Sequence, residues 1–227
     1  MNGDGHGKTP SRARLPAAER REVILRAAAQ VFADSGYRAA KVSDIAERVG
    51  VTEPVIFQNF GSKAALFAVV VERAAVEVRA SLDGLAADSG SPSVLLAHVL
   101  TGSAHGKPAQ SAPGPAAGHA PGEHAAAAYG VLFGDATALT AEPALAKPAR
   151  DAARAVAAHL ADLIRHAQAR GEVSPGADPE AAAWLLLSVL SARRLREAAM
   201  PVSLEPAVAA LALQALAPPT PAAAERP

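Results

Sequence analysis

Polar side chains in one short stretch of the chain have the types and spacing needed to bind a nucleic acid. The amides of Gln58 and Asn59 can each pair with two atoms on the edge of adenine, and the side chain of Val55 can contact a thymine methyl group. Lys63 carries an ammonium group that can bind a backbone phosphate. The candidate DNA-reading residues in this stretch are Thr52, Glu53, Val55, Gln58, Asn59 and Lys63.

These side chains need a rigid support, and the apolar pattern around them predicts two helices joined by a tight turn. Apolar residues share one face of a helix over 42–49, and Gly50 can adopt the positive φ that a sharp turn requires. A second helix over 52–60 begins at Thr52, whose hydroxyl can cap it. This arrangement is a helix-turn-helix motif, in which the second helix enters the major groove of DNA.

The sequence contains no pattern typical of a catalytic or metal site. Cysteine is absent, which excludes disulfides and thiol chemistry. Gly7, Lys8 and Thr9 resemble the end of a phosphate-binding loop, but no predicted strand precedes them. We expect no enzymatic activity and no cofactor, because Ser, His and Asp occur in no arrangement that suggests a catalytic triad and no GxSxG, HExxH or GxGxxG motif is present. We expect no metal, because no carboxylate cluster supports the scattered histidines and no helical pair relates them. The histidines in question are His98, His105, His119 and His124.

Composition favours an all-α protein. Of the 227 residues, 50% are apolar and only 4% are aromatic, and Ala, Leu and Val supply most of the apolar fraction. Ala and Leu have high helix propensity, whereas strands are enriched in β-branched and aromatic residues. No run of about 18 apolar residues is present, and the N-terminal residues lack an apolar stretch. We therefore expect a cytoplasmic protein with no membrane span and no secretory signal.

Charge is divided unevenly along the chain, although the formal total is zero. Residues 1–63 contain ten basic and seven acidic side chains, a net charge of +3, and the remainder carries −3. A basic N-terminal part is typical of a protein with an anionic partner. We expect a flexible basic arm over 1–15, a helix-turn-helix domain over 16–62, a helical domain over 63–217 with a flexible insertion near 102–123, and a disordered tail over 218–227.

Apolar spacing and helix-stop residues predict further helices on both sides of the motif. Gly36 is expected to stop the first helix, and Ser62 is expected to cap the fourth. The expected helices cover residues 16–35, 42–49, 52–60, 63–81, 93–100, 123–139, 143–170, 179–200 and 204–216.

Residues 17–67 resemble the DNA-binding domain of the tetracycline-repressor-like (TetR) family of bacterial transcription regulators. The resemblance is ordered along the sequence and covers about a quarter of it. It implies a homodimeric, all-helical repressor with an N-terminal three-helix domain and a larger C-terminal helical bundle for dimerisation and effector binding. The residues that carry it are Arg21, Ile24, Leu25, Ala27, Ala28, Phe32, Gly36, Tyr37, Val42, Ser43, Asp44, Ile45, Ala46, Gly50, Val51, Thr52, Ile56, Phe57, Phe60, Ser62, Lys63, Leu66 and Phe67.

The resemblance assigns DNA contacts to most of the candidate residues named above and adds Ser43 and Phe57 to them. Two residues depart from the family pattern. The family usually has tyrosine at the position of Phe57, and the tyrosine hydroxyl commonly contacts a phosphate. Phe57 lacks this hydroxyl and can only pack against the DNA backbone. The family often has threonine at the position of Lys41, which cannot cap the second helix but can itself approach a phosphate.

In the C-terminal domain, the resemblance implies an effector pocket between the helix after Ser62 and the middle helices. Tyr129 and Phe133 share a helix face, and they either line this pocket or belong to the core of the bundle. The residues expected at the pocket are Phe67, Val70, Val71, Tyr129 and Phe133.

The first half of the helix over 179–200 is apolar around most of its circumference. A helix with one face exposed to solvent has polar residues on that face, so this pattern indicates burial on most sides. Together with the segment 155–164 this helix could pair with its copy in a four-helix interface, or it could lie buried in its own domain. Such a dimer would hold two reading helices roughly 34–36 Å apart, or a multiple of this, on a palindromic operator. The residues expected at the interface are Leu160, Leu163, Trp184, Leu187 and Leu190.

These observations predict a one-component transcription regulator that binds double-stranded DNA as a homodimer. A repressor is favoured, with a small-molecule effector that lowers its affinity for the operator. One alternative is a silencer that needs no effector, whose pocket would be filled by side chains. Another is a helical ligand-binding protein or enzyme without DNA binding, which would show no salt-dependent affinity for DNA.

Overall fold

The computed structural model describes residues 16–89 and 142–218, and every element in these two ranges is a helix. The predicted all-α fold is therefore confirmed. The first range contains α1 (Ala17–Ala39), α2 (Val42–Val49), α3 (Glu53–Phe60) and α4 (Lys63–Ser89). The second range contains α8 (Pro143–Ala169), α9 (Pro179–Ser191), α10 (Arg193–Ala199), the 3-10 helix η1 (Val202–Leu204) and α11 (Glu205–Gln214).

Helices α1, α2 and α3 pack around a common apolar core at one end of the molecule. Large side chains from all three helices are buried there, namely Ile24, Phe32, Ile45, Ile56 and Phe60. Helices α2 and α3 have only eight residues each, which is too short for stability in isolation. Burial of these side chains therefore holds both helices in place.

Helix α1 is interrupted at Gly36, where the sequence predicts a stop. The φ of 73° and ψ of 166° at this residue lie outside helical geometry, and helical residues follow it. Beyond the interruption, the ring of Tyr37 packs against Phe67 of α4, with 4.9 Å between the ring centroids. Phe32 meets the ring of Phe67 edge-on at 4.6 Å. Phe32, Tyr37 and Phe67 form an aromatic cluster that joins the three-helix domain to the start of α4.

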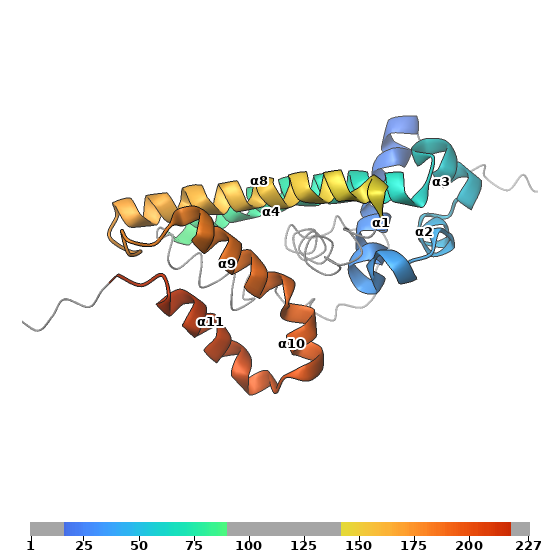
Figure 1. Cartoon of the computed structure of the whole chain (residues 1–227). Helices are drawn as coiled ribbons and strands as arrows, with labels where there is room; N and C mark the ends of the chain where they lie inside the picture. Colours follow the sequence, from blue (N-terminus) through green and yellow to red (C-terminus); the bar gives the residue numbers. More distant parts are fainter. Residues whose placement is uncertain (1–15, 90–141, 219–227) are drawn as a thin grey trace, which may run out of the picture.

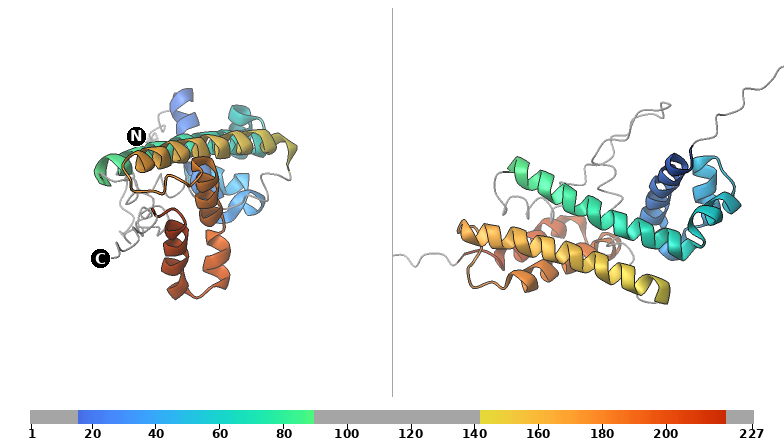
Figure 2. Two further views of the ribbon diagram at one scale, coloured as in Figure 1. Left: turned by 60° about the vertical axis from the view of Figure 1, so that its left-hand side comes forward. Right: turned by 90° about the horizontal axis from the view of Figure 1, so that it is seen from above.

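Helices α4 and α8 form two long rods that run side by side away from the three-helix domain (Figure 1 and Figure 2). Helix α4 continues to Ser89, beyond the predicted end at residue 81. Leu82 is buried, and Oδ1 of Asp83 lies 2.9 Å from Nε2 of His159 on α8. Packing against α8 therefore stabilises α4 beyond residue 81, where the apolar pattern of its own sequence no longer predicts a helix.

The predicted continuous helix over 179–200 is wrong, because the chain leaves helical geometry at Ala192 and α9 and α10 are separate helices. The change of direction lets Arg196 of α10 donate to the carbonyl of Val189 at 2.6 Å and to Glu205 of α11 at 2.7 Å. Figure 1 shows α9, α10 and α11 as an arm beside the two rods. The contacts of Arg196 accompany the change of direction between α9 and α10, which the apolar pattern of the sequence does not predict.

Several predictions fall outside the described residues. They concern the arm over 1–15, the helices over 93–100 and 123–139, the insertion near 102–123, the end of the tail, and the side chains of His98, His105, His119, His124, Tyr129 and Phe133.

Within the described ranges, no three His, Cys, Asp or Glu side chains are grouped so as to hold a metal ion. In those ranges no single helix has the length and composition to cross a membrane, although α3 and most of α4 meet both criteria as a pair bent by 65°.

Candidate nucleic-acid interface

Helix α3 lies at the outer end of the three-helix domain (Figure 1). Ile56 and Phe60 are buried, and they fix the helix to the core of this domain. The other residues leave a broad accessible surface on a short helix, which is the shape that fits the major groove. The exposed candidates on this surface are Thr52, Glu53, Phe57 and Gln58.

The turn between α2 and α3 depends on Gly50, which adopts the left-handed conformation with φ 72° and ψ 36°. The N–H of Val51 donates to the carbonyl of Ala46 at 3.0 Å and closes the end of α2. The predicted cap by Thr52 is wrong, since its side chain makes no capping hydrogen bond. Instead, the backbone carbonyl of Thr52 accepts from the N–H of Val55 at 3.0 Å, and the Thr52 side chain is exposed.

The two candidate amides on α3 have different surroundings. Asn59 is half-buried, and its Nδ2 donates to the carbonyl of Val55 at 2.7 Å, one turn back in the same helix. Gln58 is exposed. Gln58 is therefore the amide better placed to reach the edge of a base.

Arg21 of α1 contacts the C-terminal end of α3 in two ways. Its Nη1 donates to the carbonyl of Asn59 at 2.6 Å, and its guanidinium carbon lies 4.1 Å from the centroid of the Phe60 ring. The sequence marks Arg21 only as part of the family resemblance. It carries no signal for this contact, because 38 positions separate the donor from the acceptor.

Lys63 lies at the start of α4, beside the aromatic cluster. Its Nζ is 4.8 Å from the centroid of the Tyr37 ring, and it donates to the carbonyl of Arg38 at 3.4 Å. Burial lowers the pKa of Lys63, and the nearby charge of Glu142 opposes this shift. The ammonium group thus lies between the ring of Tyr37 and the carbonyl of Arg38, at the start of α4.

Tyr37 links the three-helix domain to the start of α8. Its hydroxyl donates to Oε2 of Glu142, the residue that precedes α8, at 2.8 Å. Burial, the hydrogen bond to Glu142 and the charge of Glu142 together raise the pKa of Tyr37 to about 12. A second link joins α1 to α4, where Arg73 pairs with Glu22 and also with Glu77 at 2.7 Å.

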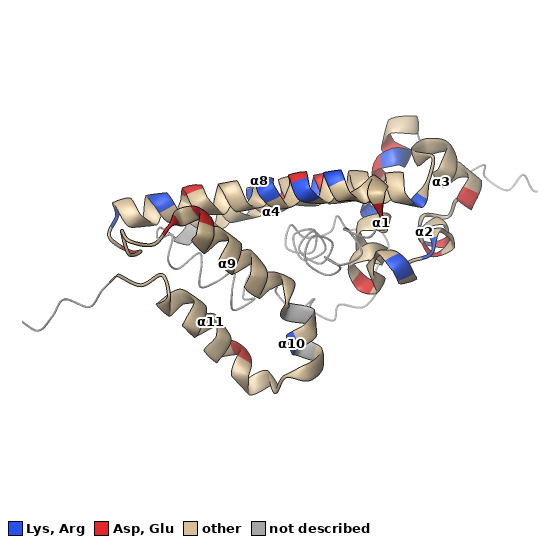
Figure 3. Ribbon diagram, in the orientation of Figure 1, with Lys and Arg blue, Asp and Glu red and all other residues tan. Residues whose placement is uncertain are grey.

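Lys41 and Ser43 lie at the start of α2. Lys41 is exposed, and Ser43 is half-buried with its hydroxyl donating to Oδ1 of Asp44 at 3.3 Å. Ser62 caps α4 as predicted, since its Oγ accepts from the N–H of Ala65 at 3.0 Å. Figure 3 shows charges of both signs on the helices of this domain. Attraction to DNA would therefore come from individually placed cations rather than from a uniformly positive face.

The residues expected at an effector pocket have packing roles in the described part of the chain. Phe67, Val70 and Val71 of α4 are all buried. Phe67 belongs to the aromatic cluster with Phe32 and Tyr37, at the junction between α1 and α4.

The residues expected at a dimer interface fall into two groups. Leu160, Leu187 and Leu190 are buried within their own chain. Leu163 is half-buried, and the side chain of Trp184 is 46% exposed. Trp184 borders a hollow of about 380 Å³ between α8 and α9.

Comparison with known proteins identifies the same part of the chain. Residues 24–70, which include α2 and α3, match the family model described as bacterial regulatory proteins, tetR family. Over 60 residues the chain is 50% identical to the HTH-type transcriptional activator FasR of Mycolicibacterium smegmatis, a match that covers 26% of this chain and 27% of FasR. The chain thus spans about a quarter of the length of this curated relative.

Solved structures are similar over most of the chain. A TetR-family regulator from Agrobacterium tumefaciens has a TM-score of 0.69 at 18% identity, covering 89% of this chain and all of the other. FadR of Bacillus subtilis, in complex with stearoyl-CoA, has a TM-score of 0.59 at 16% identity, covering 86% of this chain and 98% of FadR. At these identities the likeness shows the fold. The family and these relatives are transcription regulators and not enzymes.

Proposed function

Because its N-terminal domain places this chain in the TetR family of bacterial transcription regulators, we propose that it binds a palindromic operator as a homodimer and represses transcription there. The observation that carries the proposal is the accessible surface of α3, a helix that Ile56 and Phe60 fix to the core. Gln58 pairs with a base edge in the major groove. Lys41 and Lys63 bind phosphates and fix the register of the helix on the duplex.

A second copy of the chain is the partner that fits the face of α8 and α9. The residues that line the hollow on this face include Ala157, Ala158 and Ala161 of α8 and Trp184 of α9. Small side chains allow a helix of another molecule to approach closely. A large ring that is 46% exposed is typical of a contact surface, since aromatic residues are enriched there.

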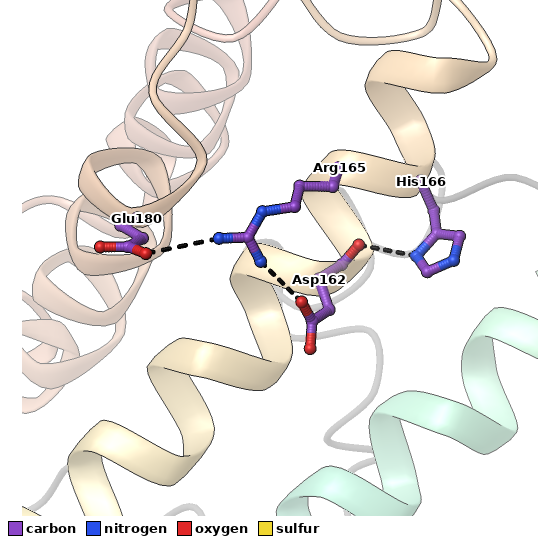
Figure 4. Close-up of polar contacts among 4 residues, drawn as sticks. All are labelled: Asp162, Arg165, His166 and Glu180. Carbon is purple, nitrogen blue, oxygen red and sulfur yellow. Dashed lines mark hydrogen bonds and ion pairs between the residues drawn. The ribbon is translucent and has the colours of Figure 1, made fainter.

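Side chains of both charge signs line the hollow, so two copies of this face can be complementary when a two-fold axis relates them. Arg165 of α8 lies between Asp162 at 2.6 Å and Glu180 of α9 at 3.4 Å (Figure 4). On the same turn, Nδ1 of His166 lies 2.7 Å from the carbonyl of Asp162. A two-fold axis through a face with both signs of charge can bring cations of one copy opposite anions of the other. The face is therefore suited to pairing with itself.

The effector of this regulator is a small molecule held by the C-terminal helices. Support comes from FadR, a protein of similar fold that was crystallised with stearoyl-CoA. A ligand that prefers the form with the two α3 helices farther apart lowers the affinity for the operator. Coupling free energies between such sites are typically about 1–3 kcal/mol, which is enough to release an operator.

DNA selection tests the proposed function. The full-length protein should enrich an inverted repeat from a random pool of duplexes, with half-site centres about 10–10.5 base pairs apart or a multiple of this. Affinity for the enriched duplex should fall steeply as salt rises, because phosphate contacts release counterions. Failure to enrich any sequence, or an affinity that salt does not change, would contradict the proposal.

A reporter gene distinguishes repression from activation. With the enriched sequence overlapping its promoter, expression should fall when the protein is supplied and recover when the effector is added. FasR, which is similar over 60 residues, is named as an activator. An increase in expression would overturn repression and leave DNA binding intact. Repression that no small molecule relieves would identify a silencer without an effector.

A further inference from the structure

The C-terminal end of α3 requires support from outside the helix. The last carbonyl groups of a helix have no partner within it. The carbonyl of Phe57 accepts from the N–H of Gly61 at 2.7 Å, and that of Phe60 accepts from the N–H of Ser62 at 3.0 Å. The carbonyl of Asn59 lies between these two and accepts from a side chain of another helix.

Arg21 of α1 supplies that side chain. Its Nη1 donates to the Asn59 carbonyl at 2.6 Å, and its guanidinium lies 4.1 Å from the centroid of the Phe60 ring. The positive charge also meets the negative end of the helix dipole of α3. One side chain thus satisfies a backbone acceptor and covers the ring that anchors the same helix end.

A guanidinium suits both contacts at once. Its planar face can stack on an aromatic ring while an N–H at its edge donates in the plane. Arg21 is also half-buried, which limits the freedom of its side chain. The contact therefore restrains α3 in two directions, along the hydrogen bond and across the ring.

We propose that Arg21 is a positioning residue for DNA reading, which sets the angle at which Gln58 enters the major groove. Gln58 is adjacent to Asn59, the residue whose carbonyl Arg21 holds. A shift at the end of α3 therefore moves the Gln58 amide directly. Sites that recognise a ligand by paired hydrogen bonds tolerate displacements of only about 0.5 Å. This inference rests on the proposed function, since it requires that α3 reads bases.

The test compares Arg21→Gln with Arg26→Gln, which removes the same charge from an exposed position of the same helix. Each full-length variant is titrated with the duplex that the parent enriches and with a scrambled duplex. Arg21→Gln should bind the enriched duplex about tenfold more weakly than Arg26→Gln does, with equal affinity for the scrambled one. Arg21→Lys should recover most of the loss, because an ammonium group can still donate to the Asn59 carbonyl and approach the ring.

Two results would overturn the proposal. One is equal affinity of Arg21→Gln and Arg26→Gln for the enriched duplex. The other is a loss of the same size on both duplexes with a salt slope reduced by about one, because that pattern identifies a direct phosphate contact. Thermal unfolding checks each variant. If Arg21→Gln does not fold, Arg21→Met takes its place, because it keeps an unbranched side chain beside the Phe60 ring and removes the hydrogen bond to the Asn59 carbonyl, and the same two results would overturn the proposal.

Amide hydrogen exchange without DNA separates this inference from the proposed function. The amides of Phe60 and Gly61 should exchange faster in Arg21→Gln than in Arg26→Gln, since the end of α3 loses its support. If the parent enriches no sequence, DNA reading fails while this difference still shows that Arg21 holds the helix. Equal exchange rates would show that Arg21 does not hold the end of α3.

Discussion

The ring of Tyr37 packs against Phe67 of α4 while its hydroxyl donates to Glu142 before α8, so one side chain touches the entry to both long helices. Lys63, a candidate phosphate ligand, lies 4.8 Å from the centroid of the same ring. A displacement of the start of α8 would therefore reach Lys63 through two contacts, from Glu142 to Tyr37 and from Tyr37 to Lys63. At the residue scale, Tyr37 is one of the side chains that connect the three-helix domain to the long helices.

Tyr37→Phe keeps the ring and removes the hydrogen bond to Glu142. We expect a decrease of about 0.5–1.5 kcal/mol in the free energy of unfolding, measured by denaturant titration. Glu142→Gln provides the second arm of a double-mutant cycle. The double variant should lose less than the sum of the two single variants, because the two residues interact. Additive losses would show that the two side chains are not coupled in solution.

The raised pKa of Tyr37 predicts a loss of stability in alkaline solution. An unfolded tyrosine ionises near pH 10, whereas Tyr37 in the fold has a pKa of about 12. Since the fold favours the protonated phenol, its contribution is complete below about pH 10 and is lost as the pH rises toward 12. Tyr129→Phe leaves Tyr37 as the single tyrosine, so phenolate absorbance reports it alone. A midpoint near pH 10 in the folded protein would contradict this prediction.

At the element scale, the angle between α2 and α3 depends on the left-handed backbone of Gly50, with φ 72° and ψ 36°. A Cβ in this conformation costs roughly 1–2 kcal/mol, although asparagine tolerates it better than other residues. Any residue that relaxes the turn changes the direction of α3 relative to α2. The turn therefore contributes to stability and to the placement of the reading surface.

Gly50→Ala should lower the free energy of unfolding by about 1–2 kcal/mol, and Gly50→Asn should lower it less. Gly84→Ala is the control, because Gly84 lies within α4 and an added Cβ there meets no atom within 4 Å. Alanine is favoured over glycine inside a helix, so this control should be neutral or stabilising. Equal stability of Gly50→Ala and Gly50→Asn in denaturant titrations would show that the left-handed turn is absent.

The elements also show which features a sequence can predict. The bounds of α2 follow from apolar spacing and Gly50, which are local signals. The break at Ala192 and the contact of Arg21 with Asn59 depend on side chains from other helices, which no local pattern encodes. Gln58 and Asn59 also look equivalent in the sequence, although the Asn59 side chain donates to the carbonyl of Val55 in its own helix and Gln58 is exposed.

At the scale of the whole molecule, the two long rods run from the three-helix domain to the end where α8 leads into α9 (Figure 2), and the face of α8 and α9 is the one that we propose for a second copy. In a dimer built on that face, the two α3 helices would be held at a distance set by α4 and α8. A ligand that changes the relation of these rods would change this distance. The dimer is therefore a condition for reading two half-sites together.

Trp184→Ala should weaken the proposed dimer by about 2 kcal/mol, since tryptophan is among the residues whose truncation costs most at protein interfaces. Sedimentation velocity over a range of protein concentrations measures this change. Val76→Ala on α4 is the control, because Val76 is an exposed apolar residue that does not line the hollow between α8 and α9. A Trp184→Ala protein that dimerises as well as the Val76→Ala protein would place the interface elsewhere.

The most direct test of base reading by α3 is to repeat the DNA selection with Gln58→Ala. Gln214→Ala is the matched control, since Gln214 is an exposed glutamine of α11 far along the chain from α3. We predict that Gln58→Ala enriches the same inverted repeat with relaxed preference at one symmetric pair of positions, while Gln214→Ala reproduces the parent sequence in full. Identical sequence preferences for the parent and both variants would contradict base reading by Gln58.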